Sequence, residues 1–211
     1  MHKSEKFWDR TAKNYDGRSG KVSPGHLKTI EKIKKHLHED DVVLDYGCAT
    51  GTISNDIAKS VAKVYGVDIS SKMIDRARIK AREQKNENTV FKHTTIFDES
   101  LAKESFNVIL SFNILHLVDN TQMVLRRINE LLKPGGVFIS STPCLGEQKS
   151  LFSSILSFVS KTGIIPKVNF LSTTDLKALI LESGFEIIES EKANNTANEY
   201  FIITRKPEAE I

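Results

Sequence analysis

The sequence predicts an α/β fold: a doubly wound sheet of seven strands, mostly parallel with an antiparallel last strand, and helices on both faces. Short apolar runs alternate with stretches whose apolar residues recur every three or four positions. A glycine-rich turn follows the first apolar run, and asparagines that favour a tight return join the last two runs. Such alternation is typical of a sheet covered by helices on both faces.

The first half of the chain predicts a helix followed by two strand–helix units. Strands are short apolar runs, and helices show apolar residues on one face. The expected elements are a helix at 27–37, a strand at 42–46, a helix at 52–61, a strand at 64–68 and a helix at 71–83.

The second half continues the same alternation. Strands are expected at 89–93, 107–112 and 136–141, with a helix at 121–132 before the last of them. The segment Lys-Pro-Gly-Gly at 133–136 predicts a helix stop followed by a turn.

The end of the chain interrupts the alternation once. Segment 143–171 is interpreted as an inserted helix and loop near the expected substrate pocket. Ser172 has the position of an N-cap for a helix that ends at Gly184. Strands at 185–190 and 199–204 then close the sheet.

Composition indicates one globular domain over residues 1–211, with 1–40 forming an N-terminal helical lid and first helix. Apolar residues make up 39% of the chain, enough for a core, and 30 basic residues nearly balance 27 acidic ones. We therefore expect no nucleic-acid partner and no membrane span. Cys48 and Cys144 stand apart without a metal-binding pattern, which predicts no metal site and a cytoplasmic location.

The turn after the first strand is the strongest functional signal. Gly47, Ala49 and Gly51 would let the backbone approach a ligand and leave helix N–H groups facing it, although a tight turn alone explains glycines equally well. Asp68 ends the second strand, where α/β nucleotide folds place a ribose-binding acid. Asp68 could instead cap the helix at 71. Together the two features favour a nucleoside-containing cofactor.

The chain resembles the class I S-adenosylmethionine-dependent methyltransferases, which have a Rossmann-like sheet, and within them the small-molecule branch that includes the ubiquinone and menaquinone C-methyltransferases. The resemblance covers nearly the whole chain. It rests on five blocks: FWDRTAKNYD at 7–16, LDYGCATG at 44–51, GVDISSKM at 66–73, FNVILS at 106–111 and LLKPGG at 131–136.

The resemblance implies S-adenosylmethionine as cofactor, S-adenosylhomocysteine as product, and a role for each matching residue. The residues expected around the cofactor are Tyr15, Asp45, Gly47, Cys48, Ala49, Gly51, Asp68, Ile69, Met73, Thr95, Ile96 and Ser111. Thr95 stands where many relatives have an adenine-binding aspartate, so either Thr95 and backbone groups or Asp98 would serve. Phe7 and Trp8 would join Tyr15 over the cofactor, or fasten the first helix to the core.

Transfer of a methyl group depends mainly on alignment, and an acidic acceptor also needs a base. His116 is the candidate catalytic base because it follows the fourth strand, where open α/β sheets bind ligands. A packing role for His116 is the alternative. Asn113 could orient an acceptor by the same reasoning, and His93 is expected to be structural.

The sequence thus predicts a methyltransferase, monomeric or homodimeric, that acts on a small apolar or aromatic acceptor. One alternative is an enzyme that modifies tRNA or another macromolecule. A second is a non-catalytic regulatory protein that binds the cofactor, and a third is a plain NAD-binding domain.

Overall fold

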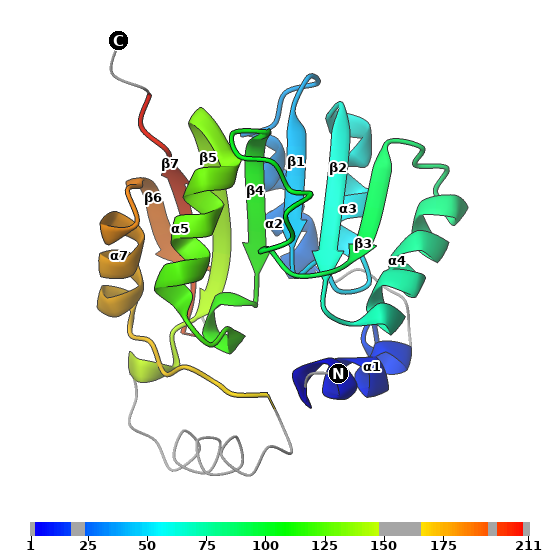
Figure 1. Cartoon of the computed structure of the whole chain (residues 1–211), viewed down its shortest axis with the longest axis horizontal. Coiled ribbons are helices and arrows are strands. Elements are labelled where there is room, and N and C mark those ends of the chain that lie inside the picture. Colours follow the sequence, from blue (N-terminus) through cyan, green and yellow to red (C-terminus); the bar gives the residue numbers. More distant parts are fainter. Residues whose placement is uncertain (1–2, 18–23, 148–165, 194–197, 209–211) are drawn as a thin grey trace.

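A single seven-stranded sheet organises the protein, which was analysed as a computed structural model that describes residues 3–17, 24–147, 166–193 and 198–208. The strand order is β3-β2-β1-β4-β5-β7-β6 (Figure 1). Neighbours among β1 to β5 pair in parallel, and β7 runs antiparallel to both β5 and β6. The strands are β1 Val42–Tyr46, β2 Lys63–Asp68, β3 Thr89–His93, β4 Phe106–Phe112, β5 Leu132–Pro143, β6 Glu186–Lys192 and β7 Glu199–Arg205. The predicted fold class is confirmed.

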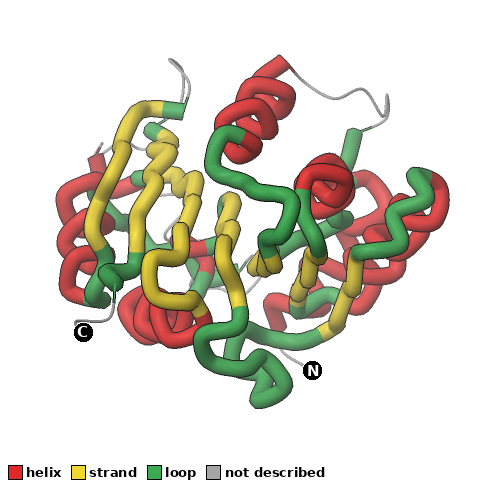
Figure 2. The backbone as a smooth tube through the Cα atoms, turned by 90° about the horizontal axis from the view of Figure 1, so that it is seen from above, coloured by secondary structure: helices red, strands yellow, loops and turns green. Residues whose placement is uncertain are grey.

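Helices lie on both sides of the row of strands when the molecule is seen from above (Figure 2). Side chains of α5 and α7 join one apolar cluster on the sheet, and side chains of α2 and α3 join another. Strand β1 contributes to both clusters, because successive side chains of a strand point to opposite faces of the sheet. Leu44 belongs to the first cluster and Val43 to the second. The helices are α1 Lys3–Thr11, α2 Pro24–Lys34, α3 Thr52–Ile57, α4 Ser71–Glu83, α5 Thr121–Leu131 and α7 Thr173–Glu182.

Polar side chains fix where the later helices begin. The Ser70 hydroxyl accepts the Met73 N–H at 3.1 Å and caps α4. Ser172 caps α7 in a reciprocal capping box with Asp175, which confirms the predicted start of that helix. Because Ser70 is the cap of α4, the alternative that Asp68 caps this helix is wrong, and the Asp68 carboxylate remains available for another role.

The predicted turn at 133–136 is wrong, because β5 already starts at Leu132. Gly135 has a φ of +74°, and its N–H donates to the Lys206 carbonyl at 3.0 Å, while the Lys206 N–H donates to Gly136 at 2.9 Å. These bonds continue the pairing past the end of β7. Leu132 pairs with Phe106, and an irregularity follows before the regular register with β4.

Smaller differences concern the helix ends and the insertion. The first predicted helix occupies Pro24–Lys34 instead of 27–37. The next ends at Ile57 and continues as a 3-10 turn at Ala58–Ser60. Most of the insertion predicted at 143–171, namely 148–165, lies outside the described residues.

Within the described ranges, helices are all too short or too polar to cross a membrane. The expected cytoplasmic location and the monomeric or homodimeric state stay predictions.

Candidate functional site

A cavity of about 600 Å³ opens at the carboxyl ends of β1, β2 and β4, the edge at which open α/β sheets bind ligands. Helix α1 lies below this edge (Figure 1). One side of the cavity is formed by residues of the glycine turn, of the strand ends and of α1. The rest of the lining is mainly apolar. Its apolar residues, which we call the apolar half, are Phe97, Phe112, Ile114, Leu117, Val118, Met123 and Val124, and the polar residues Asn113, Asp119, Asn120 and Lys167 accompany them.

The turn after β1 folds over the end of β2. Gly47 has a φ of +73° and Ala49 a φ of +47°, both in the left-handed region. The N–H groups of Gly47 and Cys48 both donate to the Val67 carbonyl, at 2.9 and 3.1 Å. Gly47 and Ala49 line the cavity as a result, so the backbone itself forms part of the binding surface.

Asp68 presents a fixed carboxylate to the same side of the cavity. Its Oδ2 accepts the Ala49 N–H at 3.0 Å, and its Oδ1 accepts the Ser70 N–H at 2.8 Å. Burial raises the pKa of Asp68, and these two hydrogen bonds oppose that rise. Each oxygen keeps an acceptor position beyond its backbone bond, which suits a ligand with adjacent hydroxyl groups.

Gly51 and Cys48 do not line the cavity. A Cβ at Gly51 would lie 2.7 Å from the Cβ of Ala77 on α4, so this glycine permits close packing of the turn on the helix. Cys48 is 7% exposed and packs in the same cluster as Ala77 and Phe91. Burial raises the pKa of the Cys48 thiol well above its usual value. Both residues shape the turn from behind.

Asp45 also lies behind the turn instead of in the cavity. It is 2% exposed, and its Oδ2 accepts the Ser54 hydroxyl at 2.5 Å. Burial raises the pKa of Asp45 to about 6, and the neighbouring Asp68 charge contributes to the rise. Asp45 is therefore a buried negative charge that ties β1 to α3.

Of the predicted site residues that follow β2 and β3, some line the cavity and others do not. Ile69, Met73 and Thr95 line the cavity. Ile96 is fully buried in the core. The Asp98 carboxylate accepts a hydrogen bond from the Thr94 hydroxyl and forms an ion pair with the Lys92 ammonium, each at 2.8 Å. Asp98 does not line the cavity. Of the two alternatives for this position, the structure places Thr95 at the cavity.

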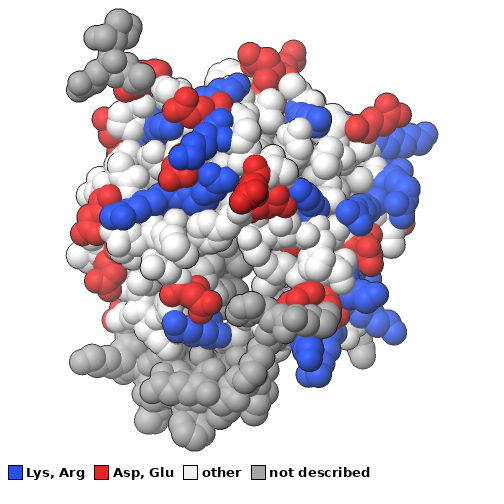
Figure 3. Space-filling view, in the orientation of Figure 1, with Lys and Arg blue, Asp and Glu red and all other residues white. Residues whose placement is uncertain are grey.

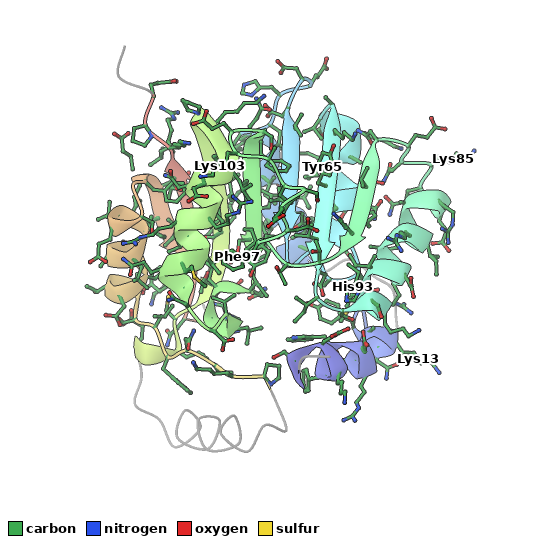
Figure 4. The ribbon with its side chains drawn as sticks, viewed as in Figure 1. Lys13, Tyr65, Lys85, His93, Phe97 and Lys103 are labelled. Carbon is green, nitrogen blue, oxygen red and sulfur yellow. The ribbon has the colours of Figure 1, made fainter. Side chains whose placement is uncertain are left out.

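Ser111 and His93 are placed differently from expectation. The Ser111 side chain is fully buried and outside the cavity lining, and its hydroxyl has no partner among the described residues. Its expected contact with the cofactor through backbone groups stays a prediction. His93, expected to be structural, lines the cavity, and its Nε2 lies 2.9 Å from the Ile69 carbonyl and 3.4 Å from Glu5. Figure 4 labels His93 at the end of β3 and Phe97 in the loop that follows.

Helix α1 and the segment after it cover the cavity. Trp8 and Tyr15 line it and meet edge to face, with ring centroids 6.3 Å apart. Phe7 packs on Trp8 at 5.0 Å and stays outside the lining. The Asp9 carboxylate accepts the Ser70 hydroxyl at 2.6 Å and thereby fastens the helix to α4.

Asp16 provides a second attachment of this segment. Its Oδ1 accepts the Thr50 hydroxyl at 2.6 Å and lies 3.0 Å from the Lys80 ammonium. Arg76 approaches the other oxygen at 3.7 Å. The covering segment is thus tied directly to the glycine turn through Thr50.

The apolar half was missed by sequence reasoning. Most of its members follow the carboxyl ends of β3 and β4, and that position was the available signal. Leucine, valine and phenylalanine in these loops are indistinguishable by pattern from core residues. Their common wall becomes visible only in three dimensions.

His116, the predicted catalytic base, is not among the described residues that line the cavity. Burial lowers the pKa of its imidazole to about 4, and its Nδ1 has no hydrogen-bond partner among the described residues. Leu117 of the 3-10 turn at Leu115–Leu117 lines the cavity, and His116 of the same turn is not among the described lining residues. The role of His116 as a catalytic base stays a prediction.

Comparison with known proteins agrees with this geometry. A family model described as a methyltransferase domain matches residues 37–196, and the chain belongs to this family. The chain is 36% identical over 152 residues to a ubiquinone biosynthesis O-methyltransferase of Cereibacter sphaeroides, covering 70% of this chain and 61% of that protein. It is 28% identical to an uncharacterised methyltransferase of Schizosaccharomyces pombe, covering 87% and 72%. The resemblance inferred from the sequence blocks is confirmed.

Solved structures share the fold. The cyclase SpnF superposes with a TM-score of 0.79 at 15% identity, covering 97% of this chain and 95% of that chain. Identity this low shows a common architecture and leaves the reaction to the site itself.

Proposed function

We propose that the protein is an S-adenosylmethionine-dependent methyltransferase that acts on a small, apolar acceptor. The observation that carries this proposal is the division of one cavity into two chemically distinct sides. One side offers backbone turns and the Asp68 carboxylate, and the other is the apolar half. A cofactor and an acceptor bound on the two sides would meet within a single cavity.

The residues present fit the cofactor. Asp68 has free acceptor positions for the two ribose hydroxyls, and Ile69 and Met73 offer apolar contact to an adenine ring. Trp8 and Tyr15 would cover the bound molecule and exclude water. When bound, S-adenosylmethionine supplies a methyl group on a positively charged sulfur. Buried Asp45 lies behind the turn, where its charge would favour binding of a cation.

An apolar acceptor is supported by the lining opposite the turn. The apolar half would bind an aliphatic or aromatic body by excluding water from it. The ubiquinone biosynthesis enzyme named above spans more than this chain, which covers 61% of its length, so its acceptor carries over only as part of this proposal.

A macromolecular acceptor is less well supported. Nucleic-acid-binding proteins present clustered basic side chains. On the face shown in Figure 3, Lys and Arg are interspersed with Asp and Glu. The balance of 30 basic and 27 acidic residues agrees with this distribution.

The proposal is tested by following labelled methyl groups. Purified protein is incubated with S-adenosylmethionine carrying a tritiated methyl group, together with either a small-molecule cell extract or total tRNA. We expect label in the solvent-extractable small-molecule fraction and none in precipitated RNA. Label in the RNA, or in neither fraction, would contradict the proposed acceptor class.

A further inference from the structure

We infer that Asn113 orients the acceptor, through a hydrogen bond between its side-chain amide and one polar group of an otherwise apolar molecule. This inference rests on the proposed function and adds a positioning residue and a property of the substrate. Asn113 lines the cavity between Phe112 and Ile114, two members of the apolar half.

Among the described residues, the Asn113 amide is a polar group of this wall without a hydrogen-bond partner in the protein. Among the described lining residues near it, Asn120 accepts the Met123 N–H at 3.0 Å to cap α5. Asp119 and Lys167 lie 3.9 Å apart as an ion pair. Within the described ranges, the side-chain amide of Asn113 has no protein partner, and it lines the cavity. Its two donors and one acceptor are therefore available to a ligand.

The backbone holds Asn113 in a defined position. Its φ is +56°, in the left-handed region that asparagine adopts more readily than most residues. Its N–H donates to the Ser141 carbonyl at 2.8 Å, which extends the contact of β4 with β5 by one residue. The amide thus stands on the rigid end of the sheet, as a group that positions a ligand requires.

Asn113 is an exposed residue whose chain neighbours in the lining, Phe112 and Ile114, are apolar. A polar group of the acceptor that reaches this amide would gain one ordinary hydrogen bond, which an analogue without that group lacks. A side-chain amide donates and accepts hydrogen bonds but does not take up a proton as a base does. Asn113 would therefore align the acceptor and would not deprotonate it.

Two substitutions separate this role from a structural one. Asn113→Gly keeps the left-handed backbone and removes the amide. Asn113→Asp keeps the shape and the tolerance of this conformation, and replaces the two N–H donors by a carboxylate. Both variants are expected to fold, which their thermal unfolding midpoints would establish.

The experiment compares a matched pair of probes, 2-naphthol and naphthalene, which differ by one hydroxyl. Dissociation constants are measured by ligand fluorescence, with and without saturating S-adenosylhomocysteine. Wild type is expected to bind 2-naphthol about fivefold more tightly than naphthalene, the ratio that one ordinary hydrogen bond provides. Asn113→Gly should bind both equally and Asn113→Asp should show an altered ratio, while both keep wild-type affinity for S-adenosylhomocysteine.

Three results would overturn the inference. Wild type that binds neither probe contradicts the apolar acceptor, and equal binding of the two probes by wild type contradicts the hydrogen bond. A preference that persists in Asn113→Gly assigns the hydroxyl to another residue. Failure of wild type to bind S-adenosylhomocysteine would instead contradict the proposed function. The ratio of the two probe dissociation constants, measured without S-adenosylhomocysteine, still tests the hydrogen bond to Asn113 in that case.

Discussion

The Ala49 N–H donates a hydrogen bond of 3.0 Å to the Asp68 carboxylate and so joins the turn after β1 to the end of β2. The residue proposed to bind the ribose therefore also holds the turn proposed to surround the methionine part of the cofactor. This bond couples the two halves of the proposed cofactor site. A substitution in either half is therefore expected to alter the geometry of the other.

Gly51 should be sensitive to substitution for reasons of packing. Gly51→Ala and Gly17→Ala both place a side chain at positive φ, which is unfavourable by about 1–2 kcal/mol. A Cβ at Gly51 would clash with Ala77, whereas no atom of the described residues lies within 4 Å of one at Gly17. Urea unfolding should show Gly51→Ala to be less stable than Gly17→Ala by about 1–3 kcal/mol. Equal losses would mean that the packing on α4 is looser than described.

Asp45 should make the unliganded protein more stable at low pH. Its folded-state pKa of about 6 lies above the value of about 3.9 in an unfolded chain. The contribution is complete below pH 4 and is lost as pH rises through 6. Relative to Asp45→Asn, wild type should lose roughly 2–3 kcal/mol of unfolding free energy between pH 4 and 7. If the difference in unfolding free energy between wild type and Asp45→Asn did not change with pH, the pKa of Asp45 in the folded protein would not be raised.

His116 should act in the opposite direction. Burial lowers the pKa of its imidazole to about 4, below the value of about 6.5 in an unfolded chain. Its contribution to stability is present above pH 6.5 and is lost as pH falls through 4. His116→Leu should remove this acid sensitivity and leave S-adenosylhomocysteine affinity unchanged. If the substitution instead weakened binding tenfold, His116 would belong to the site after all.

Asp16 should control how firmly the N-terminal segment covers the cavity. Burial and the opposing bonds from Thr50 and Lys80 act on this carboxylate, and its pKa is lowered overall. Asp16→Ala should weaken S-adenosylhomocysteine binding by about two- to tenfold, because closing the cover then depends on fewer contacts. Hydrogen exchange in 3–14 should rise. Asp75→Ala, which removes only a 3.8 Å contact with Arg78, is the control and should change neither.

Local patterns predicted most of the fold. The strands at 42–46 and 89–93 and the helix at 71–83 were predicted with the bounds that the structure has, because apolar runs and caps are encoded within a few neighbouring residues. The start of β5 was missed since it depends on bonds between Gly135, Gly136 and Lys206, far apart in sequence.

The site was less predictable, for the same physical reason. Asp68 and Gly47 carry a sequence signal, and both line the cavity. Whether Asp45 reaches a ligand depends on the direction of its side chain, which the pattern does not encode. The attachments made by Asp9 and Asp16 span 61 and 34 residues, so they appear only once the chain is folded.

Calorimetric titration of S-adenosylhomocysteine into wild type and Asp68→Ala, with NAD as the comparison ligand, tests the central claim most directly. We predict micromolar binding to wild type, a loss of tenfold or more in the variant, equivalent to about 1.4 kcal/mol, and no binding of NAD. Absence of binding to wild type, or binding that Asp68→Ala leaves unchanged, would contradict the assignment of this cavity.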